Sequence, residues 1–145
     1  MRMLAVPVLL AMFITVSSQP AFAGVRSMRF RNEMLRLVNQ TRSGHGLSTL
    51  RLNRPLSGEA WRHSVAMGRG FVLFHTTNLS TLVQPYDARA WGENIAYAAT
   101  LRRVEQLWMQ SPEHRNNLLN PTFRWGAIGV IKARGWLWVT LQLYG

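Results

Sequence analysis

The C-terminal residues constrain the fold most, because their apolar side chains recur there with a period of two. Two such stretches, GAIGVIKA (126–133) and WLWVTLQLY (136–144), flank Arg134-Gly135. A two-residue connection that contains glycine between alternating stretches is typical of a β-hairpin. One face of the second strand is purely aliphatic, with Leu137, Val139, Leu141 and Leu143. Since that face has to pack against helices, we expect an α+β domain with this hairpin at its centre.

Helical patterns occupy much of the chain before the hairpin. Apolar residues recur at helical spacing over 28–43, and Gly44 is a natural stop. Asn53 is a suitable N-cap for a second helix, which has Pro55 in its first turn and ends near Gly68 and Gly70. Two further helices are predicted, one lined by Leu101, Val104, Leu107 and Trp108 and a short one over about 112–119.

The segment 71–100 shows no clean period. It contains LFHTTNL (73–79), the turn-like QPYDAR (84–89) and WGENIAYA (91–98). A segment this long without regular structure inside a compact domain is often where function lies. Candidate site residues are therefore expected here first.

The N-terminus reads as an export signal. Arg2 precedes an apolar stretch over 3–16, and Ala21-Phe22-Ala23 fits the pattern of a signal-peptidase site. The apolar stretch ends at Ser17, before it is long enough for a membrane anchor. We expect a signal peptide over 1–23, cleavage after Ala23, and a secreted or periplasmic mature domain over 24–145 without a transmembrane anchor.

Composition narrows the chemistry and the partners. The 145 residues carry a formal net charge of +11 and no cysteine, so disulfides, thiol nucleophiles and thiolate metal sites are excluded. Only Lys132 is a lysine, and the arginines are scattered along the chain rather than clustered. The simplest reading of the basic residues is a solvated surface; if their charge selects a partner, we expect an anionic surface such as a membrane or a cell-wall polymer rather than nucleic acid.

Three ionisable residues stand among apolar neighbours: His75, Glu93 and His114. Burying a lone carboxylate costs several kcal/mol unless it finds hydrogen-bond donors or an opposite charge. If the three segments meet, they form either a zinc site of two histidines and a carboxylate or an acid–base site. The structural alternative is that Glu93 caps backbone N–H groups and His75 is a satisfied core histidine.

The short helix beginning at Ser111-Pro112 adds a feature to His114. With Ser111 as N-cap, His114 lies in the first turn, where the helix dipole disfavours the imidazolium form and favours the anion of Glu113. A neutral imidazole is what a metal ligand or a general base requires. A nucleophilic role for Ser111 is the weaker idea, because we expect an N-cap hydroxyl to be bonded to the backbone.

The order of these motifs resembles a known family. The motifs are HSVAM (63–67), FH (74–75), WGENIAYA (91–98), SPEHRNNLLNP (111–121) after Trp108, and FRWGAIGV (123–130). Together they resemble the CAP superfamily, the SCP-like domain of cysteine-rich secretory proteins, venom antigen 5 and pathogenesis-related proteins. Small secreted bacterial members are the most similar. The resemblance implies a three-layer α-β-α sandwich with a small antiparallel sheet and a surface cleft.

In many members of that family two histidines and two acidic residues line the cleft and hold a divalent metal such as zinc. Carried over by motif, three of these positions are His75, Glu93 and His114, and the resemblance implies that Glu93 faces the cleft and pairs with the histidines. The fourth acidic residue is missing, because the chain reads Trp108-Met109-Gln110-Ser111 where other members have W-x-x-E. Glu113 is the nearest carboxylate, and Asn94 is expected to bond the backbone of the cleft loop.

Two functions follow from the resemblance, and the sequence leaves open whether the protein is an enzyme. One is a secreted binding module for a small ligand, a lipid or a surface partner. The other is a zinc-dependent hydrolase or peptidase, with His75 and His114 as metal ligands and Glu93 as a further ligand or the catalytic base. The missing acidic residue favours the binding module.

Overall fold

The computed structural model describes residues 21–145, with side chains from Ser27 onward. In chain order these residues form α1 (Ala21–Gly44), β1 (Arg51–Leu52), α2 (Arg54–Gly70), α3 (Leu79–Val83), the 3₁₀ helix η1 (Gln84–Tyr86), β2 (Trp91–Ala98), α4 (Leu101–Gln110), α5 (Pro112–Leu118), β3 (Trp125–Ala133) and β4 (Trp136–Tyr144). Most of the predicted signal peptide, 1–20, lies outside the described residues, and its last three residues begin α1. Cleavage after Ala23 stays a prediction.

The four strands form one sheet in the order β1-β3-β4-β2. The predicted hairpin is confirmed, since β3 and β4 pair antiparallel up to Ala133 opposite Trp136. On its other side β4 pairs antiparallel with β2 along the whole length of β2. The two residues of β1 pair with β3 in parallel, so the predicted antiparallel sheet has one short parallel edge.

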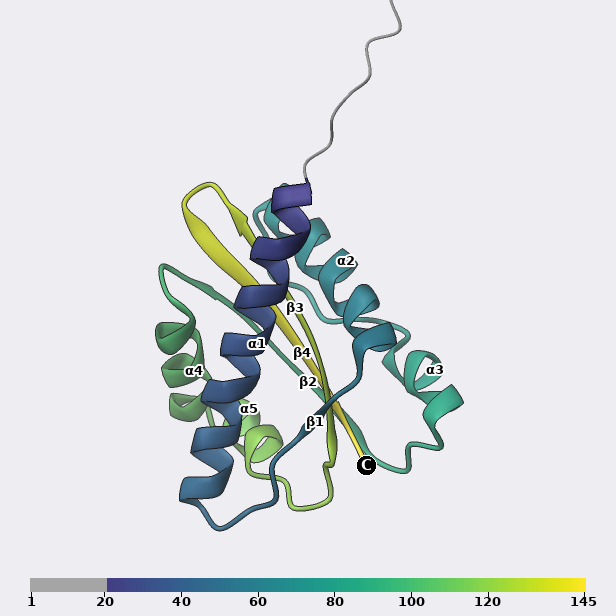
Figure 1. Cartoon of the computed structure of the whole chain (residues 1–145). Coiled ribbons are helices and arrows are strands. Elements are labelled where there is room, and N and C mark those ends of the chain that lie inside the picture. Colours follow the sequence, from purple (N-terminus) through teal and green to yellow (C-terminus); the bar gives the residue numbers. More distant parts are fainter. Residues whose placement is uncertain (1–20) are drawn as a thin grey trace, which may run out of the picture.

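Helices cover both faces of the sheet, which confirms the predicted three-layer α-β-α sandwich (Figure 1). Figure 1 shows α1, α4 and α5 on one side of the strands and α2 and α3 on the other. The aliphatic face of β4 packs into the main core against α1 and α4, as its period predicted. Residues of that core are Met34, Leu37, Val38, Val104, Trp108, Leu137, Val139, Leu141 and Leu143.

The opposite face of the sheet lies under α2. This helix begins as predicted, because the Asn53 side chain accepts a hydrogen bond from the backbone N–H of Leu56 at 2.9 Å. It packs so closely on β3 that a Cβ on Gly129 would lie 2.2 Å from the backbone of Ala60. A larger residue at Gly129 would force α2 off the sheet. The helix thereby covers Thr140 and Gln142 of β4, both of which are fully buried.

The prediction that 71–100 lacks regular structure is wrong for most of the segment. Residues 79–86 form α3 and η1, and WGENIAYA is the edge strand β2. The strand was missed because it is buried on both faces, so no polar–apolar alternation marks it. Residues 71–78 form neither a helix nor a strand, and residues 77–78 form a turn directly before α3.

Candidate functional site

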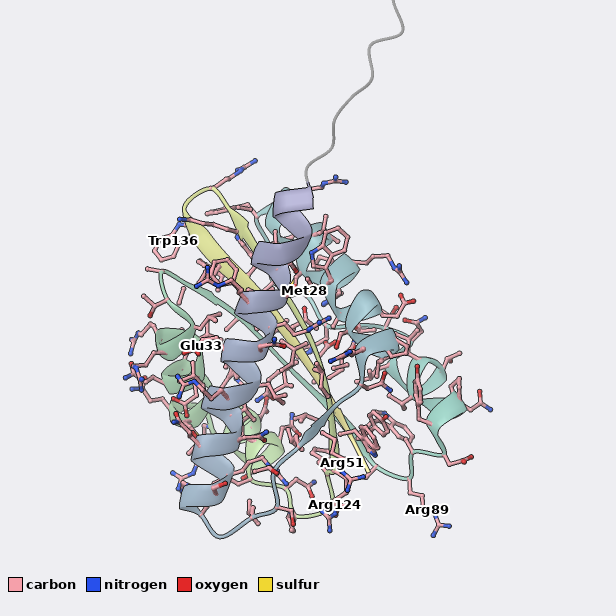
Figure 2. The ribbon with its side chains drawn as sticks, viewed as in Figure 1. Met28, Glu33, Arg51, Arg89, Arg124 and Trp136 are labelled. Carbon is pink, nitrogen blue, oxygen red and sulfur yellow. The ribbon has the colours of Figure 1, made fainter. Side chains whose placement is uncertain are left out.

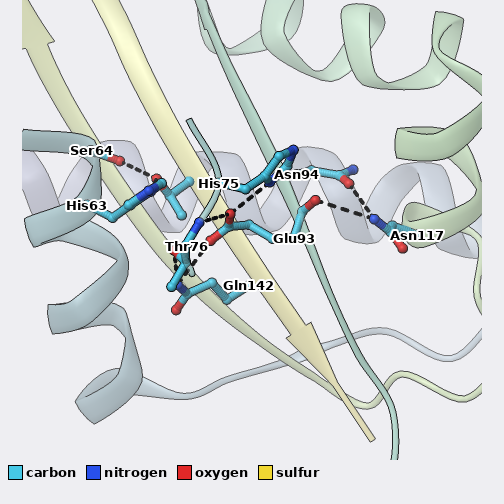
Figure 3. Close-up of polar contacts among 9 residues, drawn as sticks. His63, Ser64, His75, Thr76, Glu93, Asn94, Asn117 and Gln142 are labelled. Atoms are coloured by element: carbon cyan, nitrogen blue, oxygen red, sulfur yellow. Dashed lines mark hydrogen bonds and ion pairs between the residues drawn. The ribbon is translucent and has the colours of Figure 1, made fainter. Parts of the chain in front are cut away.

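Glu93 occupies the middle of the candidate site, on the edge strand β2. It pairs in register with Gln142 of β4, and its side chain lies on the face that α2 covers. The residue is only 8% exposed, which confirms that a carboxylate is buried here. Figure 3 shows its carboxylate in contact with His75, Thr76 and Gln142.

Each oxygen of the Glu93 carboxylate accepts two hydrogen bonds. Oε1 accepts from His75 Nδ1 and from the backbone N–H of Thr76, both at 2.9 Å. Oε2 accepts from Thr76 Oγ1 at 2.5 Å and from Gln142 Nε2 at 3.2 Å. Of the two histidine pairings that the resemblance implies, the one with His75 is present, and no hydrogen bond of the described chain joins the Glu93 carboxylate to His114. The backbone N–H bond of the structural alternative is also present.

The electrostatics of Glu93 follow from these contacts. Burial raises the pKa of the carboxyl group, but hydrogen bonds from Thr76, His75 and Gln142 together outweigh burial, and the net pKa lies below the ordinary value. The group is thus an anion stabilised by fixed donors. Its partner His75 is the outward-facing member of the pair, with 61% of its side chain exposed against 4% for Glu93.

Asn94 lies on the other face of β2, and its side chain joins α5 to the strand by hydrogen bonds. Its Nδ2 donates to the backbone oxygen of His114 at 2.9 Å, and its Oδ1 accepts from Asn117 Nδ2 at 2.9 Å. The same Asn117 amide lies 3.4 Å from the backbone oxygen of Glu93. Asn94 therefore bonds backbone as expected, but the backbone belongs to α5 rather than to the loop before the strand.

His114 is half-buried in the first turn of α5, as predicted. Burial lowers its pKa, the charge of His75 lowers it further, and Glu113 acts in the opposite direction. The neutral form expected from the sequence is thus favoured, with burial as the main cause. Glu113 itself is exposed and makes no contact with the Glu93 network among the hydrogen bonds of the described chain.

Ser111 precedes α5 as predicted, but its hydroxyl makes no capping hydrogen bond, so the expected occupation by the backbone is wrong. This residue also ends α4, and its own N–H bonds to the carbonyls of Leu107 and Trp108. One residue thereby serves two helix ends through its backbone. Nothing in the hydrogen bonds of the described chain links Ser111 to His75 or Glu93.

The predicted zinc ligands do not converge in this geometry. Within residues 21–145 no three side chains of the His, Cys, Asp and Glu types are grouped so that they could hold a metal. The Glu93 oxygens are occupied by four donors, and His75 uses Nδ1 for that carboxylate. In this arrangement the set His75, His114 and Glu93 does not fit a three-ligand zinc site. Zinc binding stays a prediction.

The structure adds residues that the sequence did not indicate as site members. Thr76 and Gln142 complete the shell around Glu93. His63 and Ser64 of α2 lie near them in Figure 3, and His63 Nδ1 lies 3.1 Å from Thr140 Oγ1, which lies 2.9 Å from Ser64 Oγ. The polar residues on the strand face opposite the leucines were the available signal, since Thr140 and Gln142 share that face with aromatic residues.

Two surface hollows of the described chain lie away from this network, and none of the predicted site residues lines either. One lies beside α3 and η1, and the other lies beside β1 and the start of β3. Their lining residues are Ser80, Thr81, Gln84, Asp87, Ala88, Arg89 and Trp91 in the first and Ser48, Thr49, Arg51, Arg124 and Trp125 in the second.

Comparison with known proteins identifies relatives of both sequence and fold. The model of the cysteine-rich secretory protein family (CAP) matches residues 35–143. A curated relative is the uncharacterized protein YkwD of Bacillus subtilis (strain 168), which is 30% identical over 125 residues. That alignment covers 80% of this chain and 47% of YkwD, so the chain spans about half the length of this relative.

Solved structures repeat the same architecture. An extracellular protein containing a SCP domain from Bacillus anthracis str. Ames superposes with a TM-score of 0.70 at 25% identity, covering 87% of this chain and 43% of that one. An outer surface protein of Borrelia burgdorferi gives a TM-score of 0.67 at 17% identity, covering 80% of this chain and 92% of that one. The second likeness concerns the fold alone.

Proposed function

Since the chain belongs to the cysteine-rich secretory protein (CAP) family, we propose that it is a secreted binding module without turnover. Its ligand is a small molecule, a lipid or a surface partner, taken up beside His75 and Glu93. The observation that carries this proposal is the saturation of Glu93, whose two carboxylate oxygens accept four hydrogen bonds.

A saturated carboxylate is poorly suited to general-base work. An effective base has a pKa near the operating pH and an oxygen free to take the proton. The pKa of Glu93 is lowered below its ordinary value, and each of its oxygens already has two donors. Proton uptake would break hydrogen bonds in a buried network, which argues for an organising role.

What Glu93 organises is the exposed segment that leads to α3. Its oxygens hold the Thr76 backbone, the Thr76 hydroxyl and the His75 ring against the sheet. The preceding residues 71–74 are all exposed. Fixing such a segment in advance reduces the entropy lost when a ligand binds to it. The carboxylate thus supports a preorganised recognition segment with His75 facing outward.

The same network also offers unused hydrogen-bonding capacity. Gln142 Oε1 is buried and has no hydrogen-bond partner within the described chain. Buried polar atoms are nearly always paired in native proteins, so unpaired ones call for a functional explanation. A hydrogen-bond donor of a ligand that reaches the network would find this acceptor there.

The proposal includes secretion through the N-terminal segment 1–23. Its apolar core and its Ala21-Phe22-Ala23 end support this. A structural relative is named as an extracellular protein, which agrees with it. Among the described residues, no helix combines the length and the apolar character that crossing a membrane requires.

The test is native mass spectrometry of the protein purified from culture medium. We expect an adduct on the wild-type protein that is lost in His75→Ala and retained in Glu113→Ala, a control at an exposed residue of the neighbouring helix. An unmodified mass, together with turnover of a peptide or ester substrate that Glu93→Gln abolishes, would overturn the proposal.

A zinc-dependent hydrolase is the second candidate, and one contact favours it. A metal-binding histidine commonly holds a carboxylate with its second ring nitrogen, as His75 Nδ1 holds Glu93. Burial also lowers the pKa of His114, which keeps that imidazole neutral. Calorimetric titration with zinc tests this candidate. Stoichiometric binding that is lost in His75→Ala would support it, and the absence of binding by the folded protein would exclude it.

A further inference from the structure

Large apolar side chains are exposed at one end of the sheet. Residues 71–74, Phe-Val-Leu-Phe, follow the end of α2, Tyr97 lies near the end of β2, and Trp136 begins β4. All six are among the exposed large hydrophobic residues, from 37% for Tyr97 to 53% for Val72. We call this surface, made of 71–74, Tyr97 and Trp136, the aromatic tip. Figure 2 shows Trp136 beside the β3–β4 hairpin, at the end of the molecule away from Arg89 and Arg124.

Ring contacts join three members of the aromatic tip, Phe71, Tyr97 and Trp136, and residues 72–74 continue the chain from Phe71. The Tyr97 ring lies 6.1 Å from that of Phe71 and 5.7 Å from that of Trp136, between ring centroids. Beneath them the buried Trp138 packs on Phe71 at 5.4 Å and on Tyr97 at 4.5 Å. The exposed rings thus rest on a core residue and keep their outer faces in solvent. Exposed apolar side chains that contact one another in this way are typical of an interaction site.

The backbone at the aromatic tip supports a functional role. Phe71 has φ 53°, in the left-handed region that glycine normally occupies at the end of a helix. Arg134 in the hairpin turn has φ 49°, and its guanidinium lies 5.3 Å from the centroid of the Phe71 ring. A phenylalanine held in this conformation and still 45% exposed gains little from burial. Such strain is typical of functional surfaces.

The charge around the aromatic tip has a single sign. The segments that build it, 65–74, 95–100 and 130–138, contain Arg69, Lys132 and Arg134 and no carboxylate. All three basic side chains are exposed. The acidic residues of the chain lie elsewhere, at Glu33, Glu59, Asp87, Glu93, Glu105 and Glu113. The surface therefore combines apolar rings with unopposed positive charge.

We propose that the aromatic tip docks onto the surface of an anionic lipid bilayer. Tyrosine and tryptophan rings prefer the boundary between headgroups and acyl chains, and arginine and lysine are attracted to anionic headgroups. An acidic polymer would leave the apolar rings unused. A second copy of the chain would bring Arg69, Lys132 and Arg134 of both copies together, with no carboxylate to offset them.

Docking in this way would place the candidate site next to the headgroups. Phe74 links the two, because its ring packs on His63 at 4.9 Å and its neighbour His75 bonds to Glu93. The inference rests on the proposed function in one respect, since segment 71–76 serves both. It names the partner as a membrane, so that a lipid or a headgroup is the ligand that the site would meet.

The test is co-sedimentation with vesicles of phosphatidylglycerol and phosphatidylcholine in equal parts, against vesicles of phosphatidylcholine alone. Two matched pairs of variants accompany the wild type: Trp136→Ser with Trp91→Ser, and Arg134→Asn with Arg89→Asn. Trp136 and Trp91 are exposed at 40% and 48% and begin β4 and β2 respectively. Asparagine tolerates the left-handed backbone at residue 134. Thermal unfolding checks that each variant is folded.

We expect binding to the anionic vesicles only, weakened about tenfold in Trp136→Ser and about fivefold in Arg134→Asn, and unchanged in the two controls. No binding, equal losses in Trp91→Ser and Trp136→Ser, or self-association through the tip without vesicles would overturn the proposal. If vesicle binding fails while a co-purifying molecule is still lost in His75→Ala, only the membrane inference falls. If vesicle binding depends on Trp136 while no such molecule exists, the proposed ligand site falls instead.

Discussion

Alternate residues of β4 face two different interiors. On one side Leu137, Val139, Leu141 and Leu143 pack in an aliphatic core against α1 and α4. On the other side Thr140 and Gln142 are equally buried under α2, but they hydrogen-bond to side chains that other elements supply. One strand therefore contributes non-directional packing to one layer and directed polar contacts to the other.

This difference separates stability from organisation. Aliphatic packing depends on volume and tolerates exchange among side chains of similar size. Each polar contact on the α2 side depends on one particular donor and acceptor, and an unpaired member costs free energy. We therefore assign most of the folding free energy to the leucine side and the placement of segment 71–76 to the α2 side. Substitutions on each side of β4 test that assignment.

The largest effect is expected on the leucine side. Leu141→Ala removes a fully buried side chain and should lower the free energy of unfolding by about 2–5 kcal/mol. Urea denaturation measures the loss. The protein that remains folded should keep the Glu93 network, because Leu141 points away from it. A loss below about 1 kcal/mol would show that this core is not the main source of stability.

A smaller loss is expected when Glu93 is altered. Glu93→Gln keeps the size of the side chain but cannot accept four hydrogen bonds, so we expect a loss of about 1–3 kcal/mol in the same denaturation experiment. Glu113→Gln is the matched control, because Glu113 is exposed and should be nearly neutral. Equal losses in the two variants would contradict the assignment of Glu93 as an organising anion.

Thr140→Val sharpens the comparison within one strand, beside Leu141. The substitution keeps the shape of the side chain but removes the hydroxyl that lies 3.1 Å from His63 Nδ1 and 2.9 Å from Ser64 Oγ. We expect a loss of about 1 kcal/mol, because Ser64 retains its bond to the Gly129 carbonyl and only His63 loses its partner. A stabilised variant would mean that these contacts are dispensable.

Acid should lower the stability of the protein by a modest amount. Burial lowers the pKa of His63, against the charge of Glu93, and it also lowers the pKa of His114. Below about pH 6.5 the unfolded chain therefore binds more protons than the folded one, and stability falls. The lowered pKa of Glu93 adds a second loss below about pH 4.3, the ordinary glutamate value, as the pH falls through the folded pKa.

Measuring the urea midpoint of unfolding from neutral to acidic pH tests whether stability falls on acidification as predicted. His63→Gln should flatten the decline between about pH 7 and pH 5, where an unfolded histidine takes up its proton. It should leave the decline at lower pH, which belongs to Glu93. A wild-type midpoint that rises on acidification would contradict the assigned protonation states.

Much of the fold could be predicted from local patterns. The hairpin, α1 and α2 follow from periodicity and from Asn53 as a cap, and the structure confirms them. The edge strand β2 could not be found this way, since Glu93 and Asn94 are both buried on opposite faces and remove the alternation that marks a strand. Such a strand is specified by its pairing with β4 rather than by its own pattern.

The candidate site could be predicted only in part. The bond between His75 and Glu93 followed from the resemblance, because both residues stand in recognisable motifs. The roles of Thr76 and Gln142 depend on the register between β2 and β4 and on the turn before α3, which no short motif specifies. The bonding of the Ser111 hydroxyl could not be predicted from a short motif either, because its expected capping bond is absent from the described structure.

The most direct test of the account is amide hydrogen exchange at Thr76 in the wild type and in Glu93→Gln. The Thr76 N–H donates to the buried Glu93 carboxylate, so its exchange reports whether this group holds the segment in place. We predict slow exchange in the wild type and a selective loss of protection at residues 75–77 in the variant, with the core strands unchanged. Unchanged protection at Thr76, combined with loss of a measurable hydrolytic activity, would show that Glu93 is catalytic and contradict the account.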